Sequence, residues 1–202
     1  MTENQTPGWD AITMSLSKIY ANQEPQHYAP VVYHSLGGSE PLDGISIYVN
    51  EKEKCYHYIT YGFSELYEKE TDNPAVSGFG YELTFRLKYN ELESTYPIWP
   101  VNLLQNIAKM VFSEGIRFDE YNTLPTGPIK LDADTKIIAL LFVIDPELSK
   151  ISTPHGSLKF LEIFGLKEDE YEGIKNKTID RREFIKQQQL QNRLLITDLD
   201  RK

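Results

Sequence analysis

Cysteine and long apolar runs are both scarce in this sequence. Cys55 is the one cysteine among 202 residues, so no disulfide can form within the chain, which suits a reducing compartment. The longest apolar run, residues 137–144, is too short to cross a bilayer, which takes about 20 residues in helical form. Residues 1–10 have neither the basic segment nor the apolar core of a signal peptide. These absences predict a cytoplasmic protein without a membrane segment.

Positive charge is also in short supply. Lys and Arg number 21 against 30 Asp and Glu, so the formal net charge is −9. We therefore expect no nucleic-acid partner, because nucleic-acid binding needs a basic surface. The same net charge would steer a basic partner towards the chain. The length of 202 residues, 40% of them hydrophobic, allows a full core, and we expect a single domain over residues 1–202 with a loose start at 1–8.

Signatures of catalysis and of metal binding are missing. The 4 histidines lie too far from one another and from Cys55 to form a ligand pair, and no HExxH, CxxC or GxSxG motif occurs. We therefore predict no catalytic residue, no metal and no cofactor. His57 lies within an expected strand, where a cross-strand hydrogen bond is its ordinary role, and the acidic cluster within 65–72 is typical of a solvated surface. The alternative is a hydrolytic enzyme in which His57 and a nearby carboxylate meet in a pocket.

Hydrophobic spacing predicts strands and a few helices. Period-two alternation is clearest at 81–88, which predicts a strand with its odd-numbered side on the core and the side from Glu82 to Lys88 in water. Segment 68–80, which leads into it, is expected to be a loop. The expected helices are 9–22, 99–115 and 180–192. The other expected strands are 45–49, 55–61, 137–144, 158–164 and 194–196.

The central helix has the clearest boundaries. It begins at Trp99-Pro100, where a missing backbone N–H is tolerated, and it ends at Gly115. Strands are grouped along the chain rather than alternating with helices. We therefore predict an α+β fold, with a mixed or mostly antiparallel sheet packed against a central helix near 100–115 and helices at both ends.

Tyrosine is abundant, with 13 residues, and several of them gather between residues 48 and 81. Some belong in a core, and exposed tyrosines form the rigid amphipathic surface that is enriched at binding hot spots. Together with the missing catalytic motifs, this composition favours a binding module over an enzyme.

Several ordered segments make this chain similar to the Suppressor of fused family, specifically its N-terminal domain. The similarity covers residues 9–199, nearly the whole chain. The segments that carry it are LGGSEPLDGISIY (36–48), HYITYGFSELY (57–67), SGFGYELTFRLK (77–88), WPVNLLQNIAKMVF (99–112), DPELSKISTPHGSLKFLEIFGLKEDE (145–170) and LLITDL (194–199).

This resemblance implies a protein-binding function without catalytic residues. Animal members of the family regulate Hedgehog signalling and clamp an extended peptide of a zinc-finger transcription factor as a β-strand between two domains. This chain resembles the first of those domains alone. Short single-domain relatives are associated with bacterial toxin–immunity systems, so the resemblance implies an immunity-type protein that sequesters a toxin or another protein.

The resemblance also assigns two partner-binding residues. Tyr67, which ends the HYITYGFSELY motif, matches a position on the peptide-facing side, and half-buried packing at a strand end is its alternative role. Asp72 is the nearest match to an acidic residue of the following loop. An extended segment would add its main chain to a nearby sheet edge, with Tyr67 as anchor and Asp72 as rim charge, and the acidity of the chain would suit a basic segment. The acidic segment 168–172 is the next candidate surface.

Overall fold

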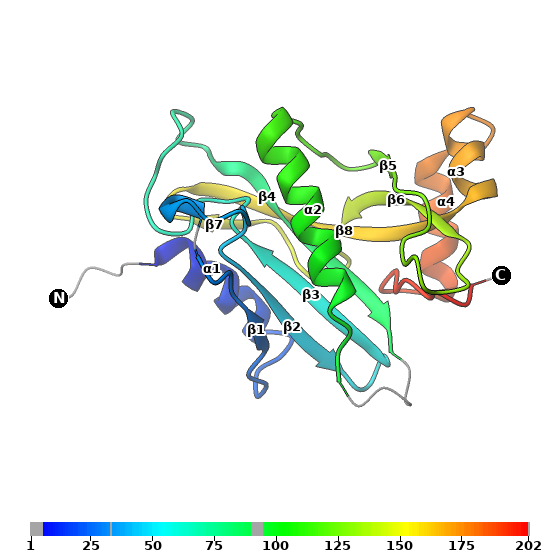
Figure 1. Ribbon diagram of the computed structural model, residues 1–202, viewed down its shortest axis with the longest axis horizontal. Helices are drawn as coiled ribbons and strands as arrows, with labels where there is room; N and C mark the ends of the chain where they lie inside the picture. Colours follow the sequence, from blue (N-terminus) through cyan, green and yellow to red (C-terminus); the bar gives the residue numbers. More distant parts are fainter. Residues whose placement is uncertain (1–5, 33, 90–94, 202) are drawn as a thin grey trace.

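The computed structural model describes residues 6–32, 34–89 and 95–201. Figure 1 shows a twisted sheet with helices packed on it and at its ends. The helices are α1 (Pro7–Ser17), α2 (Trp99–Glu114), α3 (Glu168–Lys175) and α4 (Arg181–Gln191), with a 3₁₀ turn at His34–Leu36. The strands are β1 (Gln26–Tyr28), β2 (Gly44–Asn50), β3 (Cys55–Tyr61), β4 (Val76–Lys88), β5 (Thr123–Pro125), β6 (Ile137–Ile144), β7 (Ile151–Thr153) and β8 (Gly156–Lys167).

The described strands form one eight-stranded sheet in the order β1-β2-β3-β4-β8-β6-β5, with β7 paired to β8. The strand pairs are antiparallel except β4 and β8, which run parallel. The parallel pair is therefore a seam between an antiparallel N-terminal part, β1–β4, and a C-terminal part, β5–β8. This arrangement confirms the predicted α+β fold with a mixed, mostly antiparallel sheet.

Helices cover both faces of the sheet. On one face, α2 packs its buried apolar side on the sheet, where Leu104 and Phe85 belong to the same core cluster. On the opposite face, α1 contributes Leu16 to a second apolar cluster, and α3 and α4 border a third. The predicted central helix and terminal helices are thus confirmed. None of the helices in the described ranges is long and apolar enough to cross a membrane.

The alternating strand differs from its prediction on the polar side. β4 begins at Val76, so residues expected in a loop belong to the strand. Glu82, Thr84 and Arg86 are each 0% exposed, and Lys88 alone of that side is exposed. The prediction that this side faces water was wrong, because the second and third apolar clusters flank it on the same face. Alternation distinguishes two sides of a strand without saying what covers the polar one.

Element boundaries agree best where the sequence has strong signals. β3 and β6 match their predicted residues, and α2 ends at Gly115 in the left-handed conformation, with φ +67°. The helix predicted at 9–22 begins earlier, at Pro7, and ends at Ser17. Most of the expected loose start, residues 1–5, lies outside the described residues. Residues 194–196 form no strand, and Thr197 makes one parallel bridge to Leu87.

Candidate functional site

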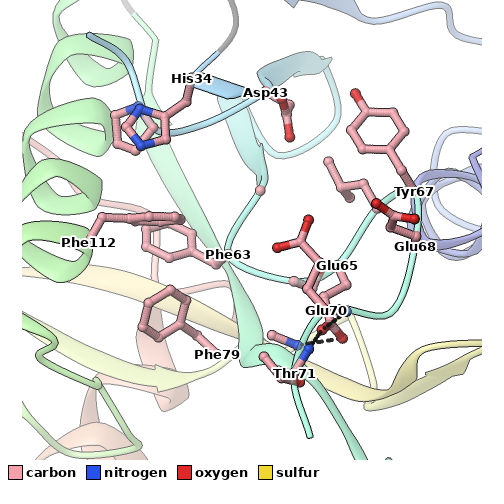
Figure 2. A pocket seen from close by; sticks show the side chains of 15 residues that line it. His34, Asp43, Phe63, Glu65, Tyr67, Glu68, Glu70, Thr71, Phe79 and Phe112 are labelled. Atoms are coloured by element: carbon pink, nitrogen blue, oxygen red, sulfur yellow. Dashed lines mark hydrogen bonds between the residues drawn. The ribbon is translucent and has the colours of Figure 1, made fainter. Parts of the chain in front are cut away.

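A pocket of about 410 Å³ opens between the connection that follows β3 and the end of α2. Figure 2 shows three phenylalanine rings on one side of it and a carboxylate-bearing stretch of chain, 65–71, on the other. The lining residues are His34, Pro41, Asp43, Gly62, Phe63, Ser64, Glu65, Leu66, Tyr67, Glu68, Glu70, Thr71, Gly78, Phe79 and Phe112.

Glu65 holds the acidic wall of the pocket in place. Its carboxylate accepts backbone hydrogen bonds from Glu70 at 2.8 Å, Thr71 at 2.6 Å and Gly78 at 3.0 Å, and pairs with Lys69 Nζ at 2.7 Å. Burial opposes ionisation, but these donors outweigh it and lower the pKa of Glu65 to about 2. Glu65 therefore organises the loop, and its oxygens are already occupied.

A second buried carboxylate, Glu82 of β4, fixes the turn after β3. It accepts hydrogen bonds from the backbone N–H of Gly62 at 3.1 Å and of Ser64 at 2.9 Å. The hydroxyls of Ser64 and Thr60 each donate to it at 2.6 Å. Burial raises the pKa of Glu82 to about 7 against the effect of these donors. The turn that carries Phe63 into the pocket is thus tied to the sheet.

Gly78 shows why a glycine is needed where β4 passes this turn. Its φ is +52°, and a Cβ at this position would lie 2.6 Å from the backbone oxygen of Phe63. Any side chain would therefore combine backbone strain with a clash. Gly78 therefore shapes the fold beside the pocket.

Three other carboxylates face the pocket without a cation. Within the described ranges, the side chains of Asp43, Glu68 and Glu70 take part in no hydrogen bond and no ion pair. Burial, followed by the charge of nearby Glu70, raises the pKa of Asp43, and His34 opposes that rise. The pocket therefore carries negative charge that the chain itself does not neutralise.

The opposite wall is aromatic. Phe79 lies 5.1 Å from Phe112 between ring centroids, and Phe63 lies 6.0 Å from Phe112 and 6.3 Å from Phe79. His34 meets the Phe112 ring edge-on at 6.2 Å. Phe63 is buried, whereas Phe79 is half-buried and Phe112 is 37% exposed. The mutual packing holds the rings in place and leaves part of this wall open to a ligand.

The two residues predicted to bind a partner have different places. Tyr67 lines the pocket and is 46% exposed. Asp72 is exposed on the following turn and is not among the lining residues. The acid that the prediction missed is Asp43, which lies in a turn-forming segment distant in sequence from Tyr67. Phe112 was missed as well, because an aromatic residue on a helix gives no sign of its exposure.

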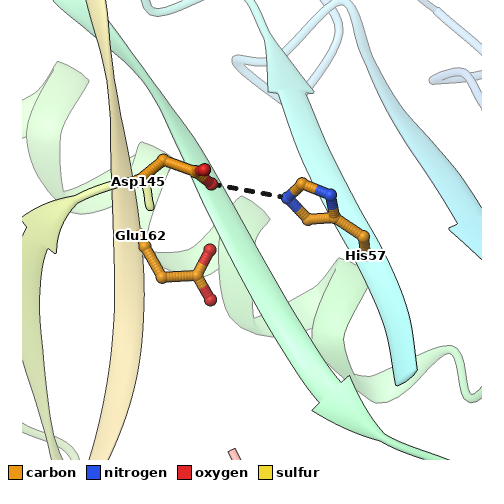
Figure 3. Close-up of side chains that lie close together, drawn as sticks. All are labelled: His57, Asp145 and Glu162. Carbon is orange, nitrogen blue, oxygen red and sulfur yellow. Dashed lines mark ion pairs between the residues drawn. The ribbon is translucent and has the colours of Figure 1, made fainter. Parts of the chain in front are cut away.

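His57, Asp145 and Glu162 form a second titratable cluster, shown in Figure 3. Arg86 Nη1 lies 2.7 Å from both Asp145 Oδ2 and Glu162 Oε2. His57 Nδ1 lies 2.9 Å from the Tyr20 hydroxyl, and its Nε2 lies 3.6 Å from Asp145 Oδ2. All four side chains of His57, Arg86, Asp145 and Glu162 are 0% exposed. The polar side of β4 is thus the middle of a closed charge network.

This cluster contains the residue types that bind metal ions, but a positively charged side chain of the protein already pairs with its carboxylates. The Arg86 guanidinium pairs with both carboxylates. Burial, and then the charge of Arg86, lower the pKa of His57 to about 4, so this imidazole is neutral near pH 7. The hydrolase alternative expected His57 and a nearby carboxylate to meet in a pocket. The structure brings His57 within 3.6 Å of Asp145 in the interior of the fold, where both side chains are 0% exposed.

Comparison with known proteins identifies relatives of one kind. The family model described as Suppressor of fused protein (SUFU) matches residues 38–202. Suppressor of fused homologues from Homo sapiens and Mus musculus are 34% identical over 173 residues, which is 79% of this chain and 35% of each relative. The chain therefore spans about a third of the length of the curated relatives it matches.

Solved structures share the same architecture. A chain of the Sufu–Fu complex matches with a TM-score of 0.86 and 30% identity, over 98% of this chain and 92% of that one. Drosophila Suppressor of Fused matches with the same TM-score of 0.86 and 30% identity, over 98% of this chain and 51% of that one. A putative SUFU homologue from Neisseria gonorrhoeae matches with a TM-score of 0.64 and 12% identity, over 96% and 94%, which establishes a common fold alone.

Proposed function

The chain belongs to the Suppressor of fused family, and we propose that it is a non-enzymatic protein-binding module whose contact surface includes the pocket beside Tyr67. One observation carries this proposal: a half-exposed tyrosine stands at a pocket with a fixed aromatic wall and uncompensated carboxylates. Tyrosine anchors next to well-packed pockets are typical of binding hot spots. One related chain was solved in a complex named Sufu–Fu, which supports an interaction role.

The partner's expected charge follows from the pocket and from the whole chain. The net charge is −9, and Asp43, Glu68 and Glu70 add unpaired negative charge at the pocket. A basic protein or extended peptide would be attracted at long range and would meet complementary charge on contact. Asp72, exposed beside the pocket, would serve as a steering group at its rim.

An extended partner segment would also need an open strand edge. β4 lies between β3 and β8, so it is not an edge strand. Among the described strands, β1 and β5 lie at the two ends of the sheet. β1 is the one close to the pocket, because its Tyr28 pairs with Ile45, near Asp43 in the chain. We propose that a peptide seated in the pocket extends along β1 by main-chain hydrogen bonds.

The finer proposal is an immunity-type role, in which the chain sequesters a bacterial protein toxin. The Neisseria protein shares this fold over 94% of its own chain, which supports the idea of a protein built from this one domain. Co-expression with a toxin whose gene adjoins this one should restore growth, and Tyr67→Ala should abolish the protection. Absence of rescue by the unaltered chain would contradict the immunity role without touching the binding role.

Partner binding is tested by capture from the native cell followed by affinity measurement. Tyr67→Ala should weaken binding more than tenfold, because truncation of an aromatic anchor typically costs about 2 kcal/mol or more. Leu190→Ala, at a residue 78% exposed on α4 and outside the pocket, is the matched control and should bind normally. Unchanged affinity of Tyr67→Ala, with a native circular dichroism spectrum, would move the interface elsewhere, first to 168–172.

A further inference from the structure

We propose that the pocket beside Tyr67 is a receptor for one cationic side chain of the partner, arginine in preference to lysine, with Asp43 as its principal counter-charge. This inference rests on the proposed binding function and names the chemical group that the site selects. It assigns a role to Asp43, Phe79 and Phe112, none of which was predicted to bind a partner.

The dimensions of the pocket suit a single side chain. Its volume of about 410 Å³ lies at the small end of the range for ligand sites, which is roughly 300–1,000 Å³. Glu82 fixes the backbone on both sides of Phe63 by accepting hydrogen bonds from the N–H groups of Gly62 and Ser64. Glu65 fixes the opposite wall by accepting from the N–H groups of Glu70 and Thr71. The pocket is therefore built into the fold and needs little rearrangement when a ligand enters.

The aromatic wall favours a flat cation. Phe112 is 37% exposed and Phe79 is half-buried, so their rings are partly open to the pocket. A guanidinium group stacks on such faces and is more weakly hydrated than an ammonium group, so it loses less on leaving water. Figure 2 shows this wall facing the carboxylate-bearing chain, with space for a ligand between them.

No basic side chain among the described residues neutralises the open carboxylates of the pocket. Lys69, the basic residue of the acidic wall, is engaged by Glu65, by the Thr71 hydroxyl and by the Val76 carbonyl. Glu65 is fully occupied by its own donors, which leaves Glu68 and the mutually repelling pair Asp43 and Glu70 as the available carboxylates. An incoming guanidinium would neutralise the repulsion between these two carboxylates, so binding would relieve a cost that the free protein carries.

The experiment is an NMR titration of the full chain with three small probes. N-acetyl-arginine amide should cause saturable shifts at the backbone amides of Asp43, Gly62 and Phe79. N-acetyl-lysine amide should bind several-fold more weakly. N-acetyl-citrulline amide, which keeps the shape of arginine without its charge, should bind at least tenfold more weakly. Equal binding of the arginine and citrulline probes, or no binding of arginine, would overturn the proposal.

Three variants locate the contact. Asp43→Asn should weaken arginine binding at least tenfold, and Phe112→Leu should weaken it a few-fold while reducing the preference over lysine. Asp134→Asn, at an exposed acid outside the pocket, should bind normally. Should Asp43→Asn alter the native spectrum, Glu70→Gln, at an exposed side chain, must show the loss instead. Full affinity in folded variants at both positions would overturn the assignment.

The probes separate this inference from the proposed function. Arginine binding at the pocket, together with unchanged partner affinity in Tyr67→Ala, would refute the partner surface and leave the cation receptor standing. Partner binding that depends on Tyr67, with no response to the arginine probe, would refute the cation receptor alone.

Discussion

The pocket beside Tyr67 and the closed network around Arg86 are both rich in carboxylates, and they differ in the cations that face them. In the network, one guanidinium lies 2.7 Å from Asp145 and 2.7 Å from Glu162, and all three side chains are 0% exposed. In the pocket, Asp43 and Glu70 face open space without an ion pair among the described residues. In the first arrangement a cation of the chain itself pairs with the carboxylates, whereas in the second we propose that a partner supplies the cation. Carboxylate content alone does not tell a structural cluster from a binding site.

Replacing the internal cation should produce the largest effect. Arg86→Met would leave the Asp145 carboxylate buried without its counter-charge and would remove a hydrogen bond to Glu162, so we expect a loss of about 3–5 kcal/mol in the free energy of unfolding. Arg193→Met is the control, because Arg193 is 61% exposed in its pairs with Glu53 and Glu147, and it should cost less than about 1 kcal/mol. Urea unfolding followed by circular dichroism measures both. Equal losses would show that the buried network is not stabilised by its own cation.

The two acids of that network should differ from each other. The Thr84 hydroxyl lies 2.7 Å from both Asp145 Oδ2 and Glu162 Oε2, yet it has a single hydrogen to donate. One carboxyl must supply the other hydrogen. Burial raises the pKa of Glu162 to about 8, whereas Arg86 holds the pKa of Asp145 well below its usual range despite burial. Glu162 is therefore the protonated partner near neutral pH.

Asp145→Asn should accordingly destabilise by about 3 kcal/mol or more, since it removes the charge that pairs with a buried guanidinium. Glu162→Gln removes no charge from a protonated acid, and its altered hydrogen bonding should cost about 1–2 kcal/mol. Unfolding free energies at pH 7 give the comparison. A larger loss for Glu162→Gln would place the proton on Asp145 instead.

The pH dependence should be opposite for the two structural carboxylates beside the pocket. The pKa of Glu65 is about 2 in the folded chain, below its unfolded value of 4.5, so its contribution is present above pH 4.5 and is lost as pH falls towards 2. The pKa of Glu82 is about 7, above 4.5, so its contribution is present below pH 4.5 and is lost as pH rises to about 7. Glu65→Gln and Glu82→Gln should each remove one of these slopes from the unfolding free energy. Parallel slopes in the two variants would contradict this assignment.

The smallest effect is expected at the rim of the pocket. Asp72→Ala should leave stability unchanged, because this side chain is exposed. It should slow association with a basic partner at low salt and have little effect at physiological salt, since rim charges act mainly on the on-rate and are screened. Stopped-flow association at two ionic strengths tests this expectation. A loss of affinity that persists at high salt would make Asp72 a contact residue rather than a steering group.

Local pattern predicted much of the fold. Alternation, apolar runs and the Pro–Gly boundaries of α2 located β3, β6 and the central helix. The polar side of β4 was wrongly predicted to face water. Apolar clusters to which α1, α3 and α4 contribute flank it on the same face, and no local pattern connects them to Arg86. Arg86 pairs with Asp145 and Glu162, and both of these partners come from the other part of the sheet. Such long-range pairing leaves no period in the sequence.

The site was predictable only in part, and by resemblance rather than by chemistry. Tyr67 was assigned from a family motif, and its place at a pocket supports that choice without testing it. Asp43 reaches the same pocket through the start of β2, and Phe112 reaches it through the end of α2. Three segments that are distant in sequence converge because the sheet holds their ends together. The composition shows that acidic residues outnumber basic ones, but it does not show which acidic residues lack an ion pair in the folded chain.

The parallel seam has a consequence for synthesis of the chain. A ribosome delivers β1–β4 well before β8, so β4 emerges with one edge unpaired while its neighbours can already form hairpins. During that interval Glu82, Thr84 and Arg86 still face water, and charged side chains on an open edge discourage pairing with other chains. When β8 arrives, Glu162 and the adjoining Asp145 convert these same residues into the closed network. We therefore expect the polar side of β4 to hinder pairing with other chains during synthesis and to join the interior once β8 has formed.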